Sequence, residues 1–324
     1  MIQAVAEIFG DRIESVDDLV GEAMSRADAL RPVVPGAAAN LAAFAAIYRF
    51  DFDAAHRLLE WAAPYQERAG PFATVYARCF GGTAARYQLD IPGALKRFRE
   101  AYEIGIRVGQ HSHAARLAGA LLGEVLYDTG DFGEAASLLD ESYQLGPEGG
   151  GTDYLSARYV IGARINAANG NRDAAVNRLA AGMQAATQLQ LPRLAAAINN
   201  ERIRLGIPIN AAVADRLRSP RDIARSGDGI ATMTAELDED SGIRLLSSSD
   251  DADDRELACR RAVGLLAGID PKQRPLAALR AQLLVAETLS AAGRAIDARN
   301  ELGSVRTLCD QHGLPQLLVD AHVG

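Results

Sequence analysis

The sequence predicts an all-α protein, an α-solenoid of about seven helical hairpins stacked in a row. Hydrophobic residues make up 48% of the chain but aromatic residues only 6%, which indicates a core of alanine and leucine that suits close helix packing. The 324 residues also exceed the usual size of a single compact core. In addition, one helix–turn–helix pattern recurs about every 40 residues along most of the chain.

The clearest copy of this pattern lies at residues 117–145. Apolar residues recur there at helical spacing on both sides of a break at Gly130-Asp131. Each of the two helices therefore has one apolar stripe. A lone hairpin cannot bury both stripes, so neighbouring hairpins are expected on either side.

Small residues set the register of successive hairpins, because they let two helices approach closely where they cross. Three pairs share a spacing of 12 positions: Gly82 with Ala94, Gly123 with Ala135, and Gly162 with Ala174. Weaker copies extend the pattern in both directions. The positions taken as equivalent are Asp53, Gly93, Glu134, Asp173, Asn210, Glu256 and Asp297.

In chain order, the sequence predicts four regions. Residues 1–36 hold a capping helix over 13–30, with Ser15 as its N-cap, and a connector over 31–36 that contains Pro32 and Pro35. Hairpins fill residues 37–218. Residues 219–254 are polar and acidic and are expected to form a flexible insertion, interpreted as a solvated loop in preference to a phosphorylated regulatory loop. C-terminal hairpins occupy residues 255–324.

Charge and cysteine content exclude several classes of protein. The net charge of −8 argues against direct nucleic-acid binding, which depends on clustered Lys and Arg. Cys79, Cys259 and Cys309 have no paired spacing, so a disulfide framework is not expected. No signal peptide or membrane span is evident. We therefore expect a cytoplasmic protein without membrane contact.

Motifs for catalysis are missing from the sequence. His111 and His113 are two positions apart and do not share a helix face, and Cys79 has no histidine partner at a recognisable spacing, which favours a packing role. The chain has no GxxxxGK[ST] loop. Asp131-Phe132-Gly133 spells the kinase triplet without the other kinase motifs. The sequence predicts no catalytic residue, no cofactor and no metal for this chain.

Leu122-Gly123 followed by Leu126, Ala135, Leu139 and Pro147 resembles the tetratricopeptide pattern, although the step here is nearer 40 than ~34 residues. With residues 124–131 and 192–205, it resembles the helical repeat region of MalT-type signalling ATPase transcription regulators of the LuxR type. It is similar also to the C-terminal region of PknK-type serine/threonine kinases. This resemblance implies a tetratricopeptide-like superhelix and a longer parent with an attached kinase, ATPase or DNA-binding domain.

Tetratricopeptide geometry would turn one face of each first helix toward a concave groove. A protein or peptide partner, or a small-molecule effector, would bind there; alternatively, several of the tyrosines pack between hairpins. The resemblance favours a regulatory module in signal transduction or transcription regulation. A free-standing scaffold or adaptor and an enzyme with an unrecognised site are the alternatives. The groove residues are Tyr76, Thr83, Arg86, Tyr87, Glu124, Tyr127, Asp128, Tyr159 and Asn166.

Overall fold

A computed structural model describes residues 1–27, 31–144, 151–219 and 228–321. Within these ranges the protein is all helical, with no strand. The helices are α1 (Ile2–Phe9), α2 (Val16–Ser25), α3 (Val33–Ile47), α4 (Phe52–Ala69), α5 (Pro71–Tyr87), α6 (Ile91–Val108), α7 (His113–Asp128), α8 (Phe132–Tyr143), α9 (Thr152–Ser156), the π-helical turn η2 (Ala157–Ile161), α10 (Gly162–Ala168), α11 (Arg172–Gln188), α12 (Pro192–Arg204), α13 (Ala211–Arg218), α14 (Gly229–Ser247), α15 (Ala252–Ala267), α16 (Pro275–Ala291), α17 (Ala295–His312) and α18 (Pro315–Asp320).

Helices adjacent in the chain pack against each other as pairs. These pairs are α3 with α4, α5 with α6, α7 with α8, α10 with α11, α14 with α15, and α16 with α17; α12 and α13 instead both pack on α14. Every second helix begins at a regular interval, with successive steps of 39, 41, 40, 39, 41 and 43 residues. The N-caps that define these steps are Asp51, Asp90, Asp131, Asn171, Asn210, Asp251 and Arg294.

One turn geometry joins several of these pairs. At the end of α7, Gly130 has a φ of 90° and its N–H donates to the Tyr127 carbonyl, while the Asp131 N–H donates to the Leu126 carbonyl. This is the Schellman arrangement, which needs a residue in the left-handed region and therefore favours glycine. Leu89 adopts the same conformation at the end of α5, with a φ of 61°. The break at Gly130-Asp131 is thus a tight helix cap followed at once by the N-cap of α8.

The predicted pairing of small residues agrees with the structure in the α5–α6 and α7–α8 hairpins. In the α10–α11 hairpin it is wrong by one residue. A Cβ on Gly123 would lie 2.9 Å from Leu139 Cγ, so this glycine does mark a close crossing of α7 and α8. Gly123 precedes and Ala135 follows the N-cap of α8. The residues at the same distances from Asn171, the N-cap of α11, are Ala163 and Ala175, which are both fully buried. Ala174 is exposed. Adjacent small residues at both positions made the pairing ambiguous, and only the turn geometry distinguishes them.

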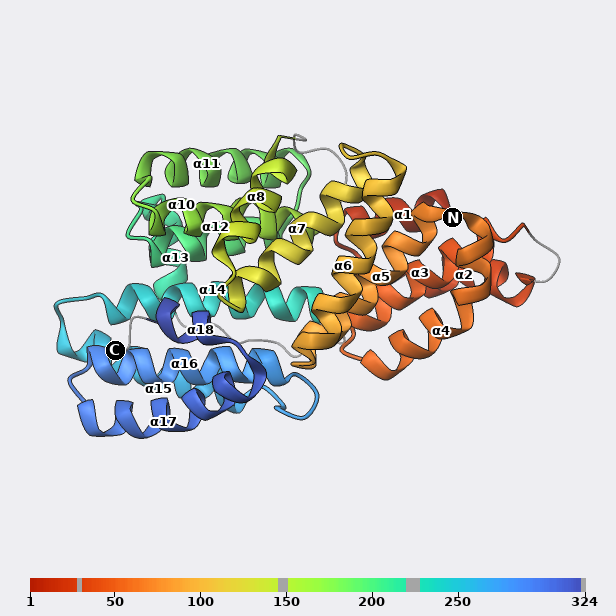
Figure 1. The fold of residues 1–324 in the computed structure, drawn as a ribbon. Coiled ribbons are helices and arrows are strands. Elements are labelled where there is room, and N and C mark those ends of the chain that lie inside the picture. The colour runs from red at the N-terminus through yellow and green to blue at the C-terminus, as the bar shows by residue number, and fades with distance from the viewer. Residues whose placement is uncertain (28–30, 145–150, 220–227, 322–324) are drawn as a thin grey trace.

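Three hydrophobic clusters hold the helices together. One lies among α1 to α5 and includes Ile230 of α14, a second extends from α5 to α12 and takes in residues of α16 to α18, and a third lies among α14 to α17. Figure 1 shows the N-terminal helices on one side and the groups α8 to α13 and α15 to α18 on the other, with α14 running between the latter two. Because α16 contacts α5 and α18 contacts α7, the C-terminal helices return to the first half of the chain.

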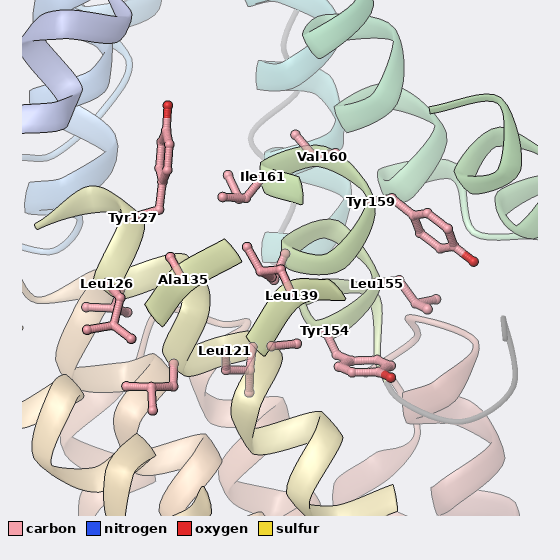
Figure 2. Packing of buried hydrophobic residues seen from close by; sticks show 14 of the residues in the cluster. Leu121, Leu126, Tyr127, Ala135, Leu139, Tyr154, Leu155, Tyr159, Val160 and Ile161 are labelled. Atoms are coloured by element: carbon pink, nitrogen blue, oxygen red, sulfur yellow. The ribbon is translucent and has the colours of Figure 1, made fainter. Parts of the chain in front are cut away.

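Figure 2 shows the packing at the centre of the second cluster. Leu121, Ala135 and Leu139 fill the space between α7 and α8, and all three are buried. Tyr127 points toward the C-terminal helices, whereas Tyr159 points away from Tyr127, on the opposite side of η2. The small side chains that the composition predicts for the core allow these close crossings.

The predicted flexible insertion is wrong for residues 228–254, and residues 220–227 lie outside the described ranges. Nineteen of these residues form α14, which packs on α12, α13, α15 and α16. Ile243 is fully buried, and a Cβ on Gly242 would overlap the Leu217 carbonyl. A polar, acidic composition favours a solvated segment, but in the structure Glu236 and Asp240 pair with arginines, which allows this segment to pack as a helix.

The N-terminal boundaries also differ from the prediction. The helix expected over 13–30 spans Val16–Ser25, and Ser15 precedes it without a side-chain capping bond; residues 28–30 lie outside the described ranges. The connector expected over 31–36 is partly helical, because α3 begins at Val33 and includes Pro35 in its first turn. Proline is tolerated there because the N–H it lacks has no intrahelical partner. None of the described helices is long and apolar enough to cross a membrane.

Candidate functional site: a central cavity lined by paired charges

A cavity of about 290 Å³ lies between the two halves of the chain. Its walls come from α5, α7, α9, η2, α10, α12, α14 and α16, which are the first helices of the hairpins, with α18 added at one side. The second helices of the hairpins contribute little because they form the outer layer. The cavity is therefore built from the inward faces of successive hairpins.

The α5–α7 wall carries a buried arginine with two carboxylate partners. Arg86 Nη2 lies 2.9 Å from Glu124 Oε1 and 2.7 Å from Asp128 Oδ2. Burial alone lowers the pKa of this guanidinium, but Glu124 and Asp128 outweigh burial and raise the pKa overall. The group ties the end of α5 to α7 through charge-assisted hydrogen bonds, which are stronger than neutral ones.

Arg193 of α12 joins the N-terminal helices to the middle of the chain. Its Nε and Nη2 atoms both donate to Asp11 at 2.7 Å, and Nη1 donates to Asp153 of α9 at 2.8 Å. The guanidinium also stacks 4.7 Å from the centroid of the Tyr48 ring. Burial raises the pKa of Asp153, although Arg193 opposes the shift. Tyr87 completes the group, since its hydroxyl donates to Asp153 at 3.2 Å.

Arg164 links α10, the first helix of the α10–α11 hairpin, to α12 and α18. It donates from Nε to Glu201 at 2.9 Å and from Nη1 to Asp320 at 2.7 Å. Tyr127 donates its hydroxyl to the same Asp320 carboxylate at 2.8 Å. Arg204 donates to the backbone carbonyl of Asp320 at 3.0 Å. Helix α18 is therefore held by three side chains that lie more than 100 residues away in the chain.

Two further arginines pair across α14 and α16. Arg244 lies 2.5 Å from both Asp240 and Glu287, and Arg274 holds Glu236 with two hydrogen bonds of 2.6 and 2.5 Å. Burial raises the pKa of Glu287 against the effect of Arg244. At Asp240 burial also acts to raise the pKa, but Arg244 and Arg204 outweigh it, so the pKa is lowered.

Apolar side chains complete the lining. Leu265 and Ile269 come from α15 and the turn that follows it, and Leu276 and Leu283 from α16. Leu317 of α18 adds to the same surface. The cavity thus combines an apolar wall with oriented polar groups, which is the usual composition of a ligand site.

The predicted groove residues fall into three sets. Arg86, Tyr87 and Glu124 line the cavity, while Tyr127 and Asp128 contact residues that line it. Tyr76 and Thr83 line a separate cavity of about 40 Å³ beside α1 and α3. Tyr159 packs against Tyr143 and Arg158, and Asn166 is half-buried in α10; neither lines the central cavity.

The register error in the α10–α11 hairpin explains the misplacement of Tyr159 and Asn166. The groove positions are counted from the small residue of each first helix, which is Ala163 here and not Gly162. The residue one position after Ala163, equivalent to Glu124, is Arg164, and the residue three positions before it is Val160. Both line the cavity. The signal that would have found them is the turn glycine Gly170, which has a φ of 78° and occupies the place of Gly130. The arginines of α12 and α14 were missed because the predicted register weakened there.

The residues considered for metal or nucleophilic chemistry lie apart from the cavity. His113 accepts or donates a hydrogen bond with the Tyr76 hydroxyl at 3.3 Å, and burial lowers its pKa. Burial raises the pKa of the Cys79 thiol well above its usual range, which disfavours the reactive thiolate. Among the described residues, no group of three His, Cys, Asp or Glu side chains is arranged to hold a metal ion.

Comparison with known proteins gives a close similarity to part of a larger protein. The chain is 62% identical over 321 residues to serine/threonine-protein kinase PknK of Mycobacterium tuberculosis (strain ATCC 25618 / H37Rv) and, to the same extent, to PknK of Mycobacterium bovis (strain ATCC BAA-935 / AF2122/97). The match covers 99% of this chain and 29% of each relative. No protein-family profile matches the chain. The identity confirms the predicted resemblance to a PknK-type region, whereas the MalT-type resemblance stays a prediction.

Proposed function

We propose that this chain is the regulatory region of a PknK-type serine/threonine kinase and that an effector or partner segment binds in the central cavity. Identity of 62% along nearly the whole chain to part of PknK supports the link to a kinase. The chain carries no kinase, ATPase or DNA-binding motif of its own, so the catalytic activity would belong to an attached domain.

The proposal includes a tetratricopeptide-like superhelix of MalT type. Hairpins that begin every 39 to 43 residues, with first helices facing a common cavity, are what such a superhelix would produce. Within this scheme, α14 to α18 would close the concave surface. The proposal also includes a cytoplasmic location, which a regulatory region attached to a serine/threonine kinase would share with that kinase.

The single observation that carries the proposal is that the cavity joins distant parts of the chain. Arg164 contacts both Glu201 of α12 and Asp320 of α18, and Arg193 contacts Asp11 as well as Asp153. A ligand that displaced one of these contacts would alter how α18 or the N-terminal helices sit. Differential binding to two arrangements is the physical requirement for control of an attached domain.

A chimeric kinase tests this function. In PknK of Mycobacterium tuberculosis, the matching region would be replaced by this chain, and phosphorylation of a generic protein substrate would be compared with the parent and with a form that lacks the region. We expect deletion to change the rate several-fold and the chimera to restore the parental rate. A deletion form with the parental rate would contradict the proposed function.

A further inference from the structure

One arginine of the cavity has no hydrogen-bond or ion-pair partner among the described residues. Arg280 of α16 lines the cavity but forms no hydrogen bond or ion pair with any residue in the described ranges. Its side chain is exposed and forms part of the cavity wall, where its charged neighbours are Arg86, Asp128, Glu124 and Arg164.

The carboxylates of the cavity are already engaged. Each of the seven that line it forms an ion pair with an arginine at 2.5 to 2.9 Å; they are Glu124, Asp153, Glu201, Glu236, Asp240, Glu287 and Asp320. Arg204 adds to the unused donors, since its contacts are one backbone carbonyl and Glu201 at 3.9 Å. A guanidinium has five N–H donors and no acceptor. Seven arginines and seven carboxylates line the described walls, so their charges balance. Within this lining, the N–H groups of Arg280 and Arg204 are the ones that no carboxylate accepts at hydrogen-bond distance.

The pKa shifts agree with the geometry. Burial, followed by the nearby Arg86, lowers the pKa of Arg280 although Asp128 and Glu124 oppose the shift. Burial, followed by Arg244 and Arg164, lowers that of Arg204 although Glu201 and Glu287 oppose it. A negative charge beside Arg280 would stabilise its guanidinium group.

The space around Arg280 suits a headgroup that carries an apolar body. The neighbouring lining positions on α16 are Ala277 and Ala281, whose small side chains leave the guanidinium uncovered. Leu276 lies one turn earlier on the same helix, and Leu265 and Ile269 extend the apolar surface. A planar guanidinium binds carboxylate or phosphate oxygens in a two-pronged arrangement.

We propose that the cavity binds a small amphiphilic anion, with its carboxylate or phosphate headgroup on Arg280 and its apolar body against the leucine- and isoleucine-rich wall. This inference deepens the proposed function, since it gives the chemical class of the effector, and it rests on that function only for the role of the ligand. Arg204 of α12 lies in the same lining.

Calorimetric titration of the full chain with three probes tests the site. The probes share an eight-carbon body and differ in the headgroup: octanoate, octyl phosphate and octanol. We expect at least one anion to bind ten-fold or more tightly than octanol, because charge-assisted hydrogen bonds supply the difference. The two anions identify which headgroup the site prefers. Equal affinities for all three probes, or no binding of either anion at millimolar concentration, would overturn the proposal.

Variants locate the headgroup. Arg280→Gln breaks no ion pair and should weaken anion binding ten-fold or more without changing octanol binding. Arg299→Gln is the matched control, because Arg299 is exposed on α17 and, among the described residues, its side chain donates only to the Ala295 carbonyl. Ala281→Phe, which fills the space beside Arg280, should block all three probes. Wild-type anion affinity in folded Arg280→Gln protein would overturn the assignment.

Binding and regulation can fail separately. If the anion binds through Arg280 but leaves the chimeric kinase unchanged, the site stands and the proposed function is wrong. If the chimera is regulated while neither anion binds, the anion site is wrong and the proposed function stands. A cooperative thermal melt of each variant verifies that it is folded.

Discussion

Replacing Arg193 with methionine should destabilise the protein far more than removing an ordinary surface arginine. The side chain of Arg193 is 4% exposed and holds Asp11, whose side chain is 1% exposed, with two hydrogen bonds of 2.7 Å. The substitution leaves the buried Asp11 and the partly buried Asp153 without their cation. Breaking a buried pair in this way costs about 3–5 kcal/mol, so we expect the free energy of unfolding in urea to fall by that amount near neutral pH.

The same variant should have a distinctive pH dependence. Burial raises the pKa of Asp153, and Arg193 is the first of the groups that oppose the shift, so the methionine variant should raise this pKa further. A carboxyl group whose pKa is higher in the folded than in the unfolded state adds stability as pH falls through the folded value and loses it as pH rises. The deficit relative to wild type should therefore shrink between about pH 7 and about pH 5.

Arg99→Met is the matched control for this experiment. Arg99 also binds a carboxylate with two hydrogen bonds, both of 2.9 Å to Glu134, but the two side chains are 47% and 37% exposed. An exposed pair of this kind contributes less than about 1 kcal/mol. If Arg193→Met costs no more than Arg99→Met, or if its deficit is the same at both pH values, the argument that burial makes the Arg193 group structural is refuted.

Three further predictions concern packing. Gly123→Leu should cost about 1–3 kcal/mol through overpacking against Leu139 and lower the melting temperature, whereas Gly133→Ala, which meets nothing within 4 Å, should not destabilise; equal melting temperatures would contradict the crossing of α7 and α8. Deletion of residues 229–247 should abolish cooperative thermal unfolding measured by circular dichroism, because α14 packs on four other helices; a sharp transition in the deletion variant would show that α14 is dispensable. The three cysteines are buried and should react with a thiol reagent only after denaturation, and rapid labelling of the native chain would indicate opening of the hairpins.

The charged groups of the cavity follow a simple arrangement. Arg86 with Asp128, Arg193 with Asp153, and Arg244 with Glu287 are separated by 42, 40 and 43 residues in the chain. Each separation is about one repeat, so each pair bridges two successive hairpins. These ion pairs orient neighbouring hairpins relative to each other, and they do so on the face that lines the cavity.

The helices and turns were largely determined by the sequence alone, because their causes are local. Apolar residues at helical spacing predict the helices, and a turn residue such as Gly130 followed by the capping Asp131 marks where one ends and the next begins. Ion pairs between residues about one repeat apart could also be predicted from the sequence, because the repeat length places them on neighbouring hairpins. The error in the α10–α11 hairpin came from aligning Gly162 with Gly123 instead of aligning the turns at Gly170 and Gly130.

Only the tertiary structure decided that the array closes around a cavity. The contacts that close it, Arg193 with Asp11 and Arg164 with Asp320, join residues 182 and 156 positions apart. The relative positions of these residues depend on the crossing angles of all the helices between them. A local sequence pattern does not determine the combined effect of those angles. The same reason explains why an acidic segment expected to be mobile is the helix α14: its carboxylates find arginines that only the folded chain places beside them.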